Sequence, residues 1–219
     1  MQIFLHDGRM DLQHPMRTLI PSLDSAVLEV LAASRAGMGV SQITRLAAKG
    51  TRPGLTTVLD RLVAHGVVLA EPANQGFLYR LNRDHLLAPV VLATSAVRGT
   101  LIDRLTDAVD GFAPQPVHAS LFGSFARGEA DADSDIDLLL IAGTGRDAAM
   151  WDDSAAQLRD RVFRWTGNRC QLMVLTVLRL RQLAAAKEPI VANWLADGLL
   201  LSGAPLADLL STAKRTSRA

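Results

Sequence analysis

The residues best suited to chemistry are Gly123 and Ser124, and two aspartates about ten residues later, Asp135 and Asp137. Alternate residues of a strand share a face, so these two carboxylates point the same way, about 7 Å apart. They repel each other unless a cation lies between them, and oxygen ligands favour Mg²⁺ or Mn²⁺. A tight turn at Gly123 also offers backbone N–H groups to phosphate oxygens. A metal beside a phosphate site is suited to phosphoryl or nucleotidyl transfer.

These residues need strands to position them, and the surrounding pattern predicts such strands. A buried strand is predicted over Val117–Phe122, directly before the Gly123 turn, which opens a helix. A second strand is predicted over Asp135–Ile141, in which hydrophobic residues that face the core alternate with the aspartates. A helix over residues 151–165 and a third strand over residues 169–177 follow.

The run GSFARGEADADSDIDLLLI resembles the signature of the DNA polymerase beta nucleotidyltransferase superfamily, a Gly-Ser pair followed by Asp-hydrophobic-Asp. Its Ser-Asp-x-Asp form is nearest to the minimal nucleotidyltransferases, and the likeness extends over Pro116–Gly203. The resemblance implies a nucleoside triphosphate and Mg²⁺ (or Mn²⁺) as ligands. It assigns the β/γ-phosphates to Ser124 with Gly123, triphosphate neutralisation to Arg127, bracing of the carboxylates to Ser134, and the catalytic metal to Asp135 and Asp137.

The sequence departs from this superfamily at a third carboxylate, which active members usually carry on a later strand. The matching position is Gln171, whose amide is neutral and a poor general base. Because a general base typically contributes about 10²- to 10⁴-fold, the loss is a serious one. Two interpretations stay open: a transferase that recruits another base, such as Glu188 or His118, and a protein that binds nucleotide without turnover.

The first half of the chain has a different pattern, with short helices that end at glycines and then two strands. Ser22 and Ser41 are candidate caps of the first two helices, and Thr51 opens the third, which Gly66 stops. A turn over residues 71–76 separates the two strands. The run SQITRLAAKGTRPGLTTVLDRLVAHGVVLAEPANQGFLYRLN resembles winged helix-turn-helix regulators.

The winged-helix resemblance implies that the third helix enters the major groove of DNA. Residues 15–90 contain eight Arg and Lys against five Asp and Glu, which is the local excess that phosphate contacts require. The other interpretation is a protein-docking or dimer module with solvated arginines. The candidate DNA-binding residues are Arg45, Thr51, Arg52, Thr56, Thr57 and Arg61.

Length and composition favour an α+β protein with two folded parts. The chain has 219 residues, 49% hydrophobic and 21% charged, so disorder of the whole chain is excluded. We expect a winged helix-turn-helix domain over residues 15–85, a connecting helix over residues 86–113 that could form a homodimer seam, and a small α/β domain with a mixed sheet over residues 114–205. A tail over residues 206–219 completes the division.

The same composition bears on location. The single cysteine, Cys170, excludes an intrachain disulfide framework, and the N-terminus lacks the pattern of a secretory signal. The most apolar segment, Leu86–Val97, is too short to cross a bilayer. We therefore expect a cytoplasmic protein with no membrane partner.

Three hypotheses from different classes follow from these features. The first is a nucleotidyltransferase that is targeted by an N-terminal DNA-binding domain. The second is a DNA-binding transcription regulator whose degenerate transferase-like domain senses nucleotide. The third is one component of a toxin–antitoxin pair, because minimal nucleotidyltransferases often occur in such pairs.

Overall fold

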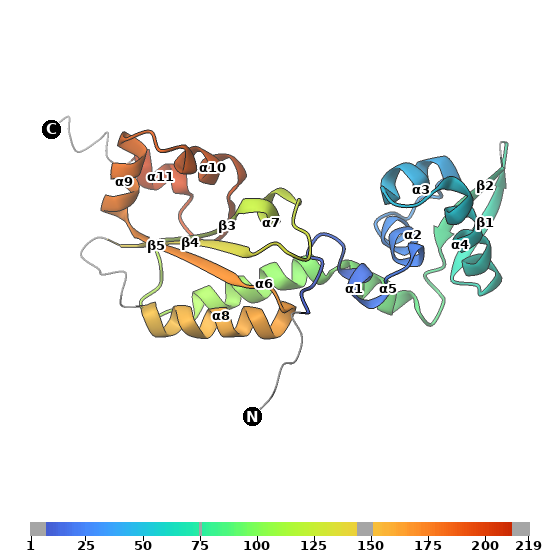
Figure 1. Ribbon diagram of the computed structural model, residues 1–219, viewed down its shortest axis with the longest axis horizontal. Helices are drawn as coiled ribbons and strands as arrows, with labels where there is room; N and C mark the ends of the chain where they lie inside the picture. Colours follow the sequence, from blue (N-terminus) through green and yellow to red (C-terminus); the bar gives the residue numbers. More distant parts are fainter. Residues whose placement is uncertain (1–7, 75, 144–150, 212–219) are drawn as a thin grey trace, which may run out of the picture. The chain divides into compact units, whose positions relative to one another are not determined.

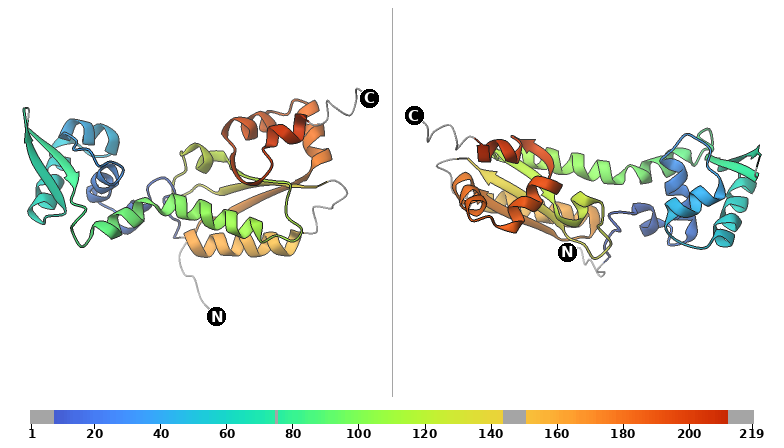
Figure 2. Two further views of the ribbon diagram at one scale, coloured as in Figure 1. Left: turned by 180° about the vertical axis from the view of Figure 1, so that it is seen from behind. Right: turned by 90° about the horizontal axis from the view of Figure 1, so that it is seen from above.

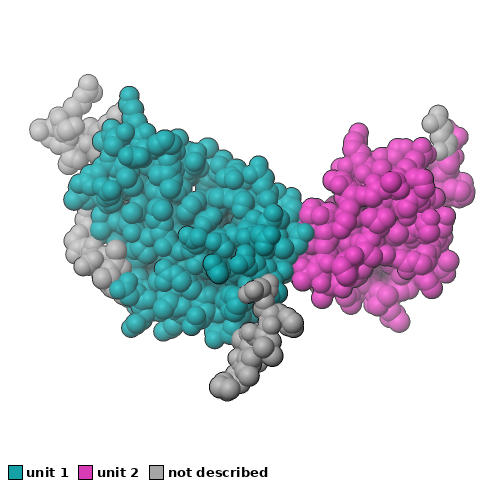
Figure 3. All heavy atoms as spheres, in the orientation of Figure 1, with its two compact units in different colours: residues 1–13, 101–219 teal, residues 14–100 magenta. Residues whose placement is uncertain are grey.

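The computed structural model describes residues 8–74, 76–143 and 151–211. The chain divides into two compact units, which are coloured separately in Figure 3. Unit 2 is His14–Thr100, and unit 1 combines Met1–Gln13 with Leu101–Ala219. Unit 2 is therefore an insertion between two segments of unit 1.

This division differs from the sequence-based boundaries at both ends. The residues that precede unit 2 belong to unit 1, because Leu12 is buried in the core of unit 1. No periodic pattern in the sequence predicts this contact. The single connecting helix predicted over residues 86–113 is wrong, because two helices meet at Ala96. The Thr94 and Ser95 hydroxyls donate to the carbonyls of Val90 and Val91, and such bonds bend helices.

Unit 2 contains the predicted order of three helices and a hairpin. It also contains a helix over Pro15–Leu19 that the sequence analysis did not predict, and a helix over Ala88–Ser95 that lies within the predicted connecting segment. Its hairpin strands pair antiparallel from Val68 with Leu81 to Ala73 with Gly76, so the turn is shorter than the predicted 71–76. The second strand also exchanges backbone hydrogen bonds with Met38 through Tyr79. The elements are α1 (Pro15–Leu19), α2 (Leu23–Ala32), α3 (Val40–Ala47), α4 (Arg52–Ala64), β1 (Val68–Ala73), β2 (Gly76–Leu81) and α5 (Ala88–Ser95).

Two helices of unit 2, α2 and α4, begin with a side-chain cap. The Ser22 hydroxyl accepts the Asp24 N–H at the start of α2, and the Thr51 hydroxyl accepts the Gly54 N–H at the start of α4. The prediction that Ser41 caps the second helix is wrong, because α3 begins one residue earlier behind Gly39. The apolar faces of these helices then meet in one core around Leu31, Ile43 and Leu59.

Unit 1 is built on a mixed four-stranded sheet in the order β5-β4-β3-β6 (Figure 1). Strands β3 and β6 and strands β3 and β4 are antiparallel, whereas β4 and β5 are parallel because α8 forms the crossover between them. The elements are α6 (Val97–Asp110), which crosses the unit boundary, β3 (His118–Phe122), α7 (Gly123–Arg127), β4 (Ile136–Ala142), α8 (Asp152–Thr166), β5 (Cys170–Thr176), α9 (Val177–Ala185), α10 (Pro189–Asp197), β6 (Leu199–Gly203) and α11 (Leu206–Ser211).

Helices cover both faces of this sheet, as Figures 1 and 2 show. Leu138 and Leu140 of β4 pack on the face covered by α6 and α8. Leu139 and Ile141 pack on the opposite face, covered by α9, α10 and α11. Because side chains alternate along β4, Asp137 shares this second face.

The C-terminal part departs from the predicted tail over residues 206–219. Its first residues form α11, and Leu206 is buried against the sheet. Residues 212–219 lie outside the described part of the chain. Within the described residues, none of the helices combines the length and the apolar character that crossing a membrane requires.

Packing of α4 yields a stability test for unit 2. Leu59 is fully buried, and we expect Leu59→Ala to lower the free energy of unfolding by about 2–5 kcal/mol because it leaves a cavity. Leu46 on α3 is 50% exposed, so Leu46→Ala should change the free energy of unfolding by no more than about 0.5 kcal/mol. Urea denaturation followed by circular dichroism measures both, and equal losses would contradict the placement of the core.

Candidate functional site

The turn between β3 and α7 brings the Gly-Ser pair against the second aspartate. Gly123 adopts φ +73°, and a Cβ atom at this position would collide with the Asp137 carboxylate. Glycine is therefore required both for the backbone conformation and for the close approach. Within the described residues the Ser124 hydroxyl makes no hydrogen bond, and it lies directly after this turn. Because α7 has only five residues, the local amides and this hydroxyl would contribute more to binding an anion than a helix dipole would.

The two aspartates lie where β4 begins. Asp137 pairs with Phe122 of β3 and with Gln171 of β5, so it occupies the centre of the sheet at the end where the Gly123 turn lies. Asp135 precedes the first residue of β4, so the prediction that the strand begins at Asp135 is wrong by one residue. Burial raises the pKa of Asp137, the negative charge of Asp135 raises it further, and Arg127 opposes the shift.

Gln171 lies at the position where the sequence predicted a missing carboxylate. It is in register with Asp137, and its Nε2 donates a hydrogen bond of 2.8 Å to Asp135 Oδ2. The amide therefore holds one carboxylate in place without adding a third negative charge. Among the described residues, no group of three or more His, Cys, Asp or Glu has a metal-binding arrangement.

Arg127 lies at the end of α7 and is held by two carboxylates. Its Nε donates to Glu129 Oε2 at 2.7 Å, and its Nη1 lies 3.5 Å from Asp197 Oδ2. The hydrogen bond that Arg127 donates to Glu129 is the main cause that raises the pKa of Arg127. Sequence reasoning missed both carboxylates. Asp197 reaches this position at the C-terminal end of α10, and no pattern in the sequence connects it to Arg127.

Ser134 has a different role from the one that the resemblance implied. Its hydroxyl donates to Asp131 Oδ1 at 2.8 Å and accepts the Asp131 N–H at 3.0 Å, which closes a turn before Asp135. This hydrogen bond lowers the pKa of Asp131. In the structure Ser134 therefore shapes the loop and does not contact the carboxylate of either Asp135 or Asp137.

The two suggested replacement bases lie away from the aspartates. His118 pairs with Ile141 and lies four residues along β3 from Phe122, about 13 Å from the level of Asp137. It is buried, which lowers its pKa, and its ring nitrogens contact the Ala204 carbonyl and the Ser120 hydroxyl. Glu188 precedes α10, at the helix end opposite to Asp197.

Cys170 is a core residue of unit 1. It begins β5 and is only 8% exposed. Burial is the main cause that raises the pKa of its thiol to about 12. A thiol in this state is not a nucleophile near neutral pH.

The donor set at the β3–β4 end of the sheet suits a hard divalent cation. The carboxylates of Asp135 and Asp137 are close enough to interact, because the negative charge of Asp135 adds to burial in raising the pKa of Asp137. The Gly123 turn leaves the space beside Asp137 that a side chain would fill. Carboxylate oxygens with additional ligand or water oxygens are the coordination that Mg²⁺ and Mn²⁺ accept.

The basic residues expected to reach DNA lie on α3 and α4 of unit 2. Arg45, Lys49 and Arg52 are exposed. Arg61 is also half-exposed, but its guanidinium forms an ion pair with Asp24 of α2. It is therefore less available to a phosphate than Arg52.

The threonines of this surface are partly engaged within the helix. The Thr51 hydroxyl caps α4. The hydroxyls of Thr56 and Thr57 donate to the carbonyls of Arg52 and Pro53, four residues earlier. Their oxygen atoms can still accept a further hydrogen bond.

Residues 102–167 match the family model of the nucleotidyltransferase domain, which covers the Gly123 turn and both aspartates. No curated protein matches the sequence. Solved structures similar to this chain include a toxin–antitoxin with AMP-PNP and a mutant of the toxin–antitoxin MntA-HpeT. In each case the identity is 18%, the match covers 53% of this chain and 84% of the other, and the TM-score is 0.36.

The raised pKa of Asp137 predicts a pH dependence of stability. A carboxyl group that binds its proton more tightly when folded makes the protein less stable as the pH rises from its ordinary pKa of 3.8 through its raised value. We expect Asp137→Asn to be more stable than wild type at pH 7 in metal-free buffer, with the difference vanishing below about pH 3. Urea titrations over pH measure this, with Asp160→Asn on the exposed side of α8 as control. A stability gain that persists at low pH would contradict it.

Proposed function

We propose that unit 1 binds a nucleoside triphosphate with a divalent metal ion and transfers its nucleotidyl group to an acceptor hydroxyl. The observation that carries this proposal is the approach of the Gly123 turn to the Asp137 carboxylate, with Asp135 beside it. A phosphate site and a metal site then share one corner of the sheet. The match of residues 102–167 to the nucleotidyltransferase domain supports the same activity.

Each residue has a part in binding that follows from its chemistry. The Ser124 hydroxyl and the amides of the Gly123 turn donate to the β- and γ-phosphates. Asp135 and Asp137 bind Mg²⁺ or Mn²⁺, which supplies charge stabilisation for the leaving pyrophosphate. Arg127 can exchange Glu129 and Asp197 for triphosphate oxygens, because all three side chains lie at the surface or are only partly buried.

Transfer joins the acceptor oxygen to the α-phosphorus, breaks the bond between the α-phosphorus and the oxygen that bridges to the β-phosphorus, and releases pyrophosphate. The proton of the acceptor hydroxyl goes to solvent water. Gln171 cannot take this proton, because its amide is neutral. We therefore propose that the rate of transfer is low, by about the 10²- to 10⁴-fold that a general base contributes. His118 lies too far along β3 from Asp137 to supply the missing base directly.

A binding titration tests the metal and nucleotide site without assuming turnover. We expect wild type to bind Mg²⁺-ATP, and Asp135→Ala/Asp137→Ala to bind it about 100-fold more weakly because both metal ligands are lost. The matched control is Asp103→Ala/Asp107→Ala, which removes the same charge from the exposed face of α6. Isothermal calorimetry measures the affinities, and equal binding by the first double variant would refute the site.

Radiolabelled nucleotides then separate transfer from sensing. Release of pyrophosphate with Mg²⁺, lost in the same double variant, indicates a transferase. Binding without release favours the alternative of a regulator that senses nucleotide. The toxin–antitoxin partner, the homodimer and the cytoplasmic location stay predictions.

A second function is favoured by unit 2. Helices α3 and α4 are followed by the β1–β2 hairpin, and α4 begins with an exposed Arg52 while α3 presents Arg45. This is the element order of a winged helix-turn-helix, and we propose that α4 contacts DNA. At the hairpin, Glu71 pairs with Arg80, so the hairpin itself adds little free positive charge.

The ion pair of Arg61 makes a matched comparison possible. We expect Arg52→Ala to weaken DNA binding and to reduce the salt dependence of log K by about 1, because one phosphate contact is lost. Arg61→Ala should weaken it less, since that guanidinium already pairs with Asp24. Fluorescence anisotropy with a duplex at several salt concentrations measures both. An unchanged slope in Arg52→Ala would contradict the proposed interface.

A further inference from the structure

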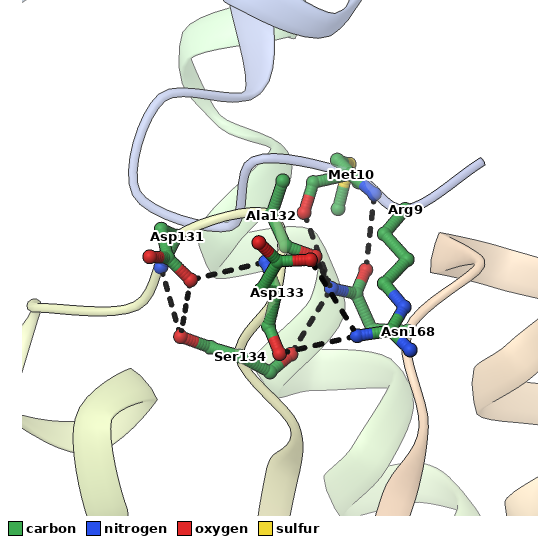
Figure 4. A network of polar contacts seen from close by, with 7 residues as sticks. All are labelled: Arg9, Met10, Asp131, Ala132, Asp133, Ser134 and Asn168. Atoms are coloured by element: carbon green, nitrogen blue, oxygen red, sulfur yellow. Dashed lines mark hydrogen bonds and ion pairs between the residues drawn. The ribbon is translucent and has the colours of Figure 1, made fainter. Parts of the chain in front are cut away.

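A buried asparagine connects three separate segments of unit 1 beside the aspartates (Figure 4). Asn168 lies in the turn between α8 and β5 and has no exposed surface. Its Oδ1 accepts the Met10 N–H at 3.1 Å. Its Nδ2 faces three carbonyl oxygens, those of Met10 and Ala132 at 3.2 Å and that of Ser134 at 3.1 Å.

These contacts matter because Asp135 lies outside the strand ladder. The Ser134 carbonyl, directly before Asp135, accepts from Asn168. The Ile136 N–H, directly after it, donates to the Arg169 carbonyl at 2.9 Å. The peptide groups on both sides of Asp135 are therefore attached to two adjacent residues, Asn168 and Arg169, of the connection between α8 and β5.

The N-terminal segment closes the other side of this network. Met10 donates its N–H to the Thr166 carbonyl at 3.0 Å as well as to Asn168. Arg9 Nη1 donates to the Asp133 carbonyl at 3.2 Å, so the segment also reaches the loop directly. Gly167 permits this approach, because a Cβ atom there would collide with Gly8. Figure 4 shows the loop residues and the N-terminal segment on either side of Asn168.

We propose that Asn168 is a positioning residue that holds Asp135 in the geometry needed to bind the metal ion beside Asp137. The inference rests on the proposed function of unit 1. An amide is suited to this place because it supplies donors toward the carbonyls and an acceptor toward Met10. A carboxylate would place oxygen against three carbonyl oxygens, and an aliphatic side chain would remove the donor that these three carbonyls share.

The effect on metal binding separates positioning from a general structural role. We expect Asn168→Leu to weaken Mn²⁺ binding by about 10- to 100-fold, the usual effect of losing a residue that orients a metal ligand. Electron paramagnetic resonance of free Mn²⁺ measures the affinity. The stability control is Val109→Ala, which removes buried methyl groups from α6 away from this loop and should leave Mn²⁺ affinity unchanged.

A double-mutant cycle tests whether the effect passes through Asp135. In an Asp135→Asn background, Asn168→Leu should not weaken Mn²⁺ binding further, because the ligand that it positions is already lost. Additive losses would overturn the inference. So would wild-type affinity in a folded Asn168→Leu protein, and this result would leave the proposed function intact.

The same measurements also cover a variant that does not fold and a wild type that does not bind Mn²⁺. If Asn168→Leu fails to fold, Asn168→Ser replaces it, since serine cannot reach the loop carbonyls from this turn, and the same cycle is run. If wild type binds no Mn²⁺, the proposed function itself fails, and the inference fails with it.

Discussion

The contact on which the structure of unit 1 depends is the approach of the Gly123 backbone to the Asp137 carboxylate. It requires a residue without Cβ, in a conformation with positive φ, at the end of a central strand. It also requires β3 and β4 to pair so that Phe122 lies opposite Asp137. Backbone N–H groups and a carboxylate thereby lie at one corner of the sheet.

This arrangement carries an electrostatic cost that the neighbouring residues only partly relieve. Asp137 is half-buried beside Asp135, and both effects raise its pKa. Gln171 donates one hydrogen bond to Asp135, and Arg127 contributes positive charge from the side. Groups held in such unfavourable surroundings are typical of binding and catalytic sites. A neutral residue at position 171 limits the repulsion but also removes a proton acceptor.

The sequence was most informative where one element contains both the pattern and the chemistry. The hydrophobic run of β4 and its alternating aspartates predicted a strand and a shared face, and the observed strand, Ile136–Ala142, is shifted by one residue. The register of β5 placed Gln171 opposite Asp137, as the motif had suggested. The hydrogen-bond partner of Ser134 and the boundary between the units were predicted less well, because turns and irregular segments have no periodicity.

The sequence by itself determined which side chains are available and which local elements present them: the Gly-Ser turn, the two aspartates and the missing third carboxylate. Only the tertiary structure decided the partners of these groups. Asp197, Asn168 and Met10 come from elements distant in the sequence, and their contacts depend on how helices and an irregular N-terminal segment pack around the sheet. Local propensity acts within a few residues, whereas these hydrogen bonds join groups up to 158 residues apart.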